Sequence, residues 1–230
     1  MENNYLTEKN PMSVLVYFSL PIIIGNLFQQ TYTMADSAIV GRYVGEGALA
    51  AVGASYSLTN IFICIAIGGG IGSSVIVSRY FGAERFEKMK TAVYTSLAIF
   101  LVISLLLGGF GLIFSREILS LLNTPSDVFD MAVEYLNIYF LGLPLLFMYN
   151  VLSSMFNALG KSRIPLYFLI FSSVFNVILD WILVTQFDMG VSGVAWATLI
   201  AQGISAVLSF IALMAQFKKL APVRAKPFDF

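Results

Sequence analysis

The sequence has no histidine, a single cysteine and few charged side chains. Only 11% of its 230 residues are charged, and acidic and basic residues are equal in number. The absence of histidine removes the commonest metal ligand and acid–base catalyst. The lone Cys64 lies inside an apolar run, which excludes an internal disulfide and argues against a cysteine-based metal site. A net charge of zero argues against nucleic acid as a partner.

Apolar residues make up 58% of the chain, and the mean hydropathy is +0.85. Soluble domains usually carry about 25% charged residues, and a water-soluble fold could not cover this much apolar surface with so few charges. The apolar runs are continuous and do not alternate with polar residues, which argues against a transmembrane barrel. We therefore predict an all-α integral membrane protein.

Six stretches are long enough to cross ~30 Å of hydrocarbon as helices, and together they predict one six-helix transmembrane bundle over residues 1–220. Short polar or glycine-bearing turns separate them, including 41–47, 116–127 and 160–163. Residues 221–230 turn polar and are predicted to be a tail or the start of a linker. The predicted helices are about 14–39, 49–78, 91–114, 130–158, 166–187 and 191–216.

Lysine and arginine give an independent test of this layout. With six helices, eleven basic residues fall on one side of the membrane and two on the other, which is the bias expected of a cytoplasmic side. The chain is thus predicted to be a multi-pass protein of the plasma or inner membrane with both termini cytoplasmic. The eleven are Lys9, Arg79, Arg85, Lys88, Lys90, Lys161, Arg163, Lys218, Lys219, Arg224 and Lys226, and the two are Arg42 and Arg116.

Two carboxylates, Asp36 and Asp180, lie within the predicted helices. A charge at membrane depth costs roughly 2.5–3.5 kcal/mol on insertion scales, and no basic residue lies at a comparable depth. At 1.5 Å per residue, Asp36, Asp180 and Thr198 all lie ~8–12 Å from the outer ends of their helices. Asn176 is one turn from Asp180 on the same face. These four oxygen-bearing side chains predict a site that holds Na⁺ or shares protons between the acids. The alternative is that each acid is a satisfied buried polar group.

Other polar residues lie deeper. Gln30, Asn150 and Asn157 could line a substrate cavity, although interhelical hydrogen bonds of this kind are common in membrane bundles. Pro21 lies inside the first helix, where it removes a backbone hydrogen bond and favours a static kink or a hinge.

Several of these segments resemble the MATE (multidrug and toxic compound extrusion) family. The resemblance covers nearly the whole chain and is most specific in the first helix. The matching segments are 20–36 (LPIIIGNLFQQTYTMAD) with 40–42 (VGR), 48–55, the loop 79–90, 176–180 (NVILD) and 193–198 (GVAWAT).

This resemblance implies a cation-coupled antiporter, not an enzyme, that exports drugs or other cationic and amphipathic compounds by alternating access. It implies no cofactor, with H⁺ or Na⁺ as the coupling ion near Asp36, Asn176, Asp180 and Thr198, and bending of the first helix near Pro21. The family has two six-helix lobes, whereas this chain supplies only the N-terminal one. The resemblance therefore implies a second lobe as partner, either a missing C-terminal half or a second copy.

Two rival functions remain. A lipid-linked oligosaccharide flippase of the same superfamily would need a basic central cavity for its pyrophosphate head group, and no lysine or arginine lies at mid-membrane. An intramembrane enzyme could use the two acids as an aspartyl pair, but no accompanying motif is present.

Overall fold

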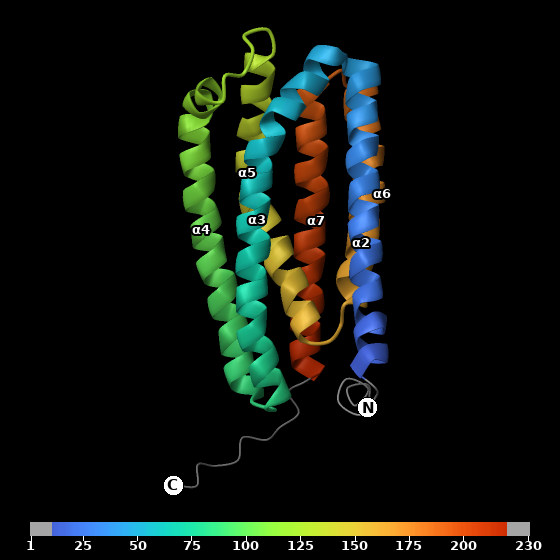
Figure 1. Ribbon diagram of the computed structural model, residues 1–230, viewed down its shortest axis with the longest axis vertical. Helices are drawn as coiled ribbons and strands as arrows, with labels where there is room; N and C mark the ends of the chain where they lie inside the picture. The colour runs from blue at the N-terminus through green and yellow to red at the C-terminus, as the bar shows by residue number, and fades with distance from the viewer. Residues whose placement is uncertain (1–10, 220–230) are drawn as a thin grey trace.

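The computed structural model describes residues 11–219, which form six long helices and one short π-helical turn and contain no strand. The predicted polar tail at 221–230 lies outside the described residues. The helices run alternately up and down one elongated bundle, so that the described ends of the first and last helices lie at the same end (Figure 1). The elements are α2 (Pro11–Ile39), η1 (Val40–Val44), α3 (Glu46–Gly82), α4 (Phe86–Leu121), α5 (Phe129–Ala158), α6 (Arg163–Thr185) and α7 (Gly190–Lys219).

This architecture confirms the predicted all-α six-helix bundle. Among the described helices, α3 to α7 are each long and apolar enough to cross a membrane, and α2 is not among them. With 29 residues, α2 is ~43 Å long and could also span the hydrocarbon. Its lower hydropathy comes from a run of amides, hydroxyls and one carboxylate between Asn26 and Asp36.

Two predicted turns are shorter than expected. The turn at 41–47 is wrong in its first part, because Val40–Val44 continues α2 as a π-helical turn and Glu46 already begins α3. Only Gly45 interrupts the helices, with a φ of +116° that favours glycine. Likewise α4 continues beyond its predicted end at 114 to Leu121. Hydropathy marks where a chain leaves hydrocarbon, whereas a helix can continue into the polar interface.

The helix α5 is the centre of the bundle. It packs against α3, α4 and α7, while α6 packs against α7 and α2 packs against α6. The largest fully buried side chains of α5 are aromatic, namely Phe140, Phe147 and Phe156. The half of the bundle made of α3, α4 and α5 is therefore an apolar core, and α2 is attached to the opposite side through α6.

Close contact between α4 and α5 depends on Gly108. A Cβ atom at this position would lie 2.8 Å from the backbone carbonyl oxygen of Phe140, which cannot move independently of α5. The neighbouring Gly109 meets nothing within 4 Å. Alanine substitutions at these two glycines therefore separate the effect of helix propensity on stability from the effect of close packing.

We expect Gly108→Ala to destabilise the bundle by about 1–3 kcal/mol, because the added methyl group overpacks the α4–α5 contact. Gly109→Ala should leave stability unchanged or raise it by up to about 1 kcal/mol, since alanine is the better helix former. Equilibrium unfolding of the purified protein in mixed detergent micelles measures both. Equal stability of the two variants would show that α4 and α5 do not approach this closely.

Candidate functional site

Four polar side chains from three helices meet in one half of the bundle. Asp36 belongs to α2, Asn176 and Asp180 lie one turn apart on α6, and Thr198 belongs to α7. Because α6 packs against both α2 and α7, its polar face lies between the other two contributors. The structure thus brings together the three residues that the sequence placed at one depth and Asn176, which it placed one turn from Asp180.

The amide of Asn176 connects the three helices. Oriented so that donors face acceptors, its Nδ2 donates to Asp36 Oδ1 at 3.0 Å, and its Oδ1 accepts from the Thr198 backbone N–H at 3.2 Å. In the opposite orientation, Nδ2 donates to Thr198 Oγ1 at 3.3 Å. Asn176 is only 2% exposed, so these contacts are shielded from solvent and lipid.

The two carboxyl groups are neighbours. The side chains of Asp36 and Asp180 lie within hydrogen-bonding reach of each other. Asp180 is fully buried, and its Oδ1 has no hydrogen-bond partner among the described residues. Two ionised carboxylates this close repel each other, so a proton or another cation near the pair would lower its energy.

Two tyrosines lie near the carboxyl pair, and the sequence reasoning missed both. Tyr32 and Tyr135 each lie within electrostatic range of Asp36 and Asp180. Tyr32 could have been found, because it precedes Asp36 by four residues and shares its helix face. Tyr135 comes from α5, and nothing in the local sequence indicates that it packs near α2.

A cavity of about 70 Å³ lies beside the cluster and is shared by α2, α3, α5, α6 and α7. Asn176 and Thr198 form part of its wall. A polar cavity of this size has room for water molecules with several partners each. The other polar residues that line it are Gln29, Tyr32, Tyr149, Asn150, Ser172, Ser173 and Gln202.

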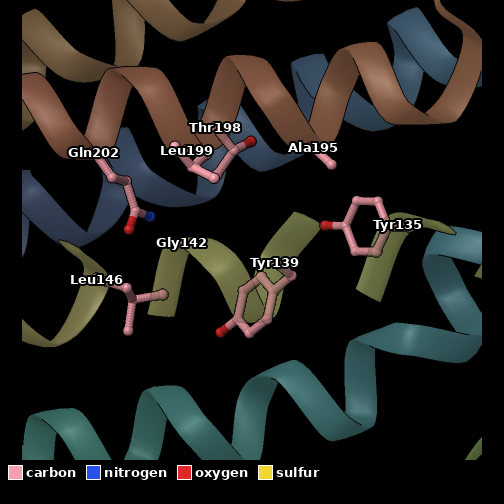
Figure 2. Close-up of a pocket in the computed structure, with 8 residues that line it drawn as sticks. All are labelled: Tyr135, Tyr139, Gly142, Leu146, Ala195, Thr198, Leu199 and Gln202. Carbon is pink, nitrogen blue, oxygen red and sulfur yellow. The ribbon is translucent and has the colours of Figure 1, made fainter. Parts of the chain in front are cut away.

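A second cavity of about 20 Å³ lies between α5 and α7 and shares Thr198 and Gln202 with the first. Figure 2 shows the Tyr135 hydroxyl and the Gln202 amide pointing into the space between the two helices. Thr198 therefore lies where the carboxyl cluster meets both cavities.

The remaining predicted residues are scattered. Asn150 lines the larger cavity and donates through Nδ2 to the Leu146 carbonyl oxygen of its own helix at 2.8 Å. Gln30 is exposed on α2, and Asn157 lines neither of these two cavities. Pro21 is buried, and α2 stays helical through it. The cavity and gating roles of these residues stay predictions.

Within residues 11–219, no three acidic, cysteine or histidine side chains gather in a group that could hold a metal ion. A cation at the cluster would therefore have the two carboxylates and the Thr198 hydroxyl as its ligands, and the Asn176 oxygen only if that amide turned over. Such a set suits a proton or a hard monovalent ion.

The fold matches that of known transporters. An outward-facing conformation of a multidrug resistance MATE family transporter of the MOP superfamily aligns with a TM-score of 0.89 at 23% sequence identity, over 100% of this chain and 51% of that one. At this identity the likeness shows the fold alone.

Bacterial proteins named for drug resistance are similar in sequence. The chain is 32% identical over 199 residues to the probable multidrug resistance protein YpnP of Bacillus subtilis (strain 168), covering 86% of this chain and 45% of that protein. It is 29% identical over 217 residues to the multidrug export protein MepA of Staphylococcus aureus (strain MRSA252), covering 91% and 47%. The chain thus spans about half the length of the curated relatives it matches. The MatE family profile matches residues 21–182, and this membrane-embedded six-helix chain belongs to the MatE family.

Proposed function

We propose that this chain is one lobe of a cation-coupled antiporter that exports small organic molecules by alternating access. The observation that carries the proposal is the neighbouring carboxyl pair inside the helical bundle, in which Asp180 is fully buried and Asp36 is partly buried. The names of the relatives and the half-length match support multidrug efflux by an assembly of this lobe with a second one.

The coupling of cation binding to a conformational change follows from the free-energy cost of holding the charged carboxyl pair within the membrane. When the shared cation leaves, the pair carries uncompensated charge at membrane depth, which costs several kcal/mol. The lobe then favours whichever conformation gives those oxygens access to water or to a cationic substrate. A cation can drive transport only through this difference in affinity between two conformations.

The proton is the coupling ion that best fits this arrangement. The Asn176 amide directs its nitrogen toward Asp36 and its oxygen toward Thr198, so it offers no free oxygen to the space between the acids. Na⁺ would require that amide to turn over, whereas a proton needs only the two carboxyl groups.

The charge distribution of the bundle supports an orientation with both termini in the cytoplasm. The α3–α4 turn, the α5–α6 turn and the end of α7 lie at one end of the bundle, and α2 begins there (Figure 1). This end carries the described basic residues of those segments, whereas Arg42 and Arg116 belong to the other end. Lysine and arginine accumulate on the cytoplasmic side of membrane proteins.

No feature of the described residues favours the flippase alternative. The two central cavities are lined by amides, hydroxyls and apolar side chains, without lysine or arginine. A pyrophosphate head group in such a cavity would lack the positive charge that its binding requires.

We expect Asp36→Asn and Asp180→Asn each to lower gradient-driven dye efflux at least tenfold in proteoliposomes that contain the complete transporter assembly. Each amide removes the charge that the cation must neutralise. The matched control is Asp188→Asn, at an exposed loop position between α6 and α7 with a φ of +51° that asparagine tolerates. Full efflux by both membrane-embedded variants would disprove coupling at this pair.

A pH gradient alone should drive efflux in Na⁺-free buffer, and a Na⁺ gradient at equal pH should drive less than a tenth of that rate. Thr198→Val, which replaces a hydroxyl by a methyl group of similar size, should keep at least half of the pH-driven rate. Transport driven by Na⁺ alone, with a Na⁺ requirement that rises about tenfold in Thr198→Val, would instead assign Na⁺ as the coupling ion.

A further inference from the structure

A groove of about 450 Å³ lies between α3 and α4, away from the carboxyl cluster and on the side of the bundle that carries the α3–α4 turn. Its volume falls within the ~300–1,000 Å³ typical of sites for small ligands. Neither cavity described above shares a lining residue with it. The proposed transport function therefore does not account for it.

Three hydrogen-bond donors in this groove lack partners among residues 11–219. Lys88 is exposed and makes no salt bridge within residues 11–219, whereas nearby Lys90 pairs with Glu87 at 3.2 Å. The hydroxyls of Tyr80 and Thr95 likewise have no partner in the described part of the chain.

The hydroxyl of Thr95 is the most informative of these donors. Threonine in a transmembrane helix usually donates to a carbonyl oxygen in the preceding turn. Ser96 and Thr91 in the same groove do so, to Ala92 at 2.8 Å and Glu87 at 3.0 Å. Thr95 does not, although an unpaired hydroxyl facing hydrocarbon is costly. An acceptor from outside the protein would remove that cost.

The groove changes from charged to apolar along its length. Lys88 lies near the start of α4, Thr95 is seven residues or ~10 Å further along, and Ile99 is eleven residues or ~16 Å along. Ile76 of α3 and Phe100 of α4 complete the apolar wall. A ligand that fits must carry an anionic group, then hydrogen-bond acceptors, then a hydrocarbon chain.

We propose that this groove binds an anionic phospholipid. Its phosphate contacts Lys88, an ester carbonyl accepts from Thr95, and an acyl chain lies along Ile76 and Ile99. Four basic residues between 79 and 90 supply a positive field at this end of the bundle against Glu84 and Glu87. Basic pockets between transmembrane helices on the cytoplasmic side are the usual sites of anionic lipid head groups.

Native mass spectrometry of the purified full chain tests the proposal by counting phosphatidylglycerol and phosphatidylcholine molecules retained from defined mixtures. The wild type should retain phosphatidylglycerol preferentially. Lys88→Gln should lower its retention about fivefold and abolish the preference, as expected for one lysine near a lipid phosphate at about 1 kcal/mol. Lys90→Gln, the matched control with a paired charge, should change retention less than twofold.

A second variant separates the contribution of the lipid head group to binding from that of the ester carbonyls. Thr95→Val should lower retention of both lipids two- to threefold and leave their ratio unchanged, because both carry ester carbonyls. Equal retention by the Lys88 and Lys90 variants would overturn the proposal. So would displacement of the lipid by millimolar inorganic phosphate, or a dimer that closes the groove and excludes lipid.

Discussion

A carboxylate inside a membrane is tolerated only when something neutralises or solvates it, and this constraint organises the bundle. Asp180 is fully buried on α6, and its neighbour Asp36 comes from α2. The helix α2 packs mainly against α6, so the polar contact through Asn176 lies in the interface that attaches α2 to the rest of the lobe. A change in the charge of the acid pair therefore acts directly on the packing of α2.

The two halves of the bundle differ in how their interiors are packed. Where α5 packs against α3 and α4, close helix contacts and buried aromatic rings give a tightly packed apolar core, as at Gly108 against the backbone of Phe140. Around α6 and α7, the interior holds amides, hydroxyls and cavities. Packed apolar cores deform little, whereas amides and hydroxyls that line cavities can exchange hydrogen-bond partners at smaller cost. Any movement of the lobe is accordingly expected where α2, α6 and α7 meet.

How far the sequence predicts this molecule depends on the range of each interaction. Asp36, Asp180 and Thr198 could be placed at one level, and Asn176 one turn from Asp180, because helical rise and spacing are local rules. The structure brings these four residues together. The positions of Tyr135 and of Gln202, which lines both cavities, could not be predicted in this way, because they depend on how α5 packs against α7. That packing is set by contacts such as Gly142 against Leu199, and no local pattern specifies which residues will meet. The turn after α2 was predicted too long, because the π-helical turn Val40–Val44 continues the helix and the single residue Gly45 decides where it stops.

The exposed face of α2 also carries polar side chains that need a partner. Asn26 and Gln30 are four residues apart on α2, and both are exposed. Two amides that face lipid within the membrane would be costly, since hydrocarbon offers them no hydrogen-bond partners. In the proposed two-lobe assembly this face would line the space between lobes, where water or substrate could bind the amides. The helix would then present the cation site on one side and the substrate path on the other, so that a shift of α2 driven by the acid pair reaches both.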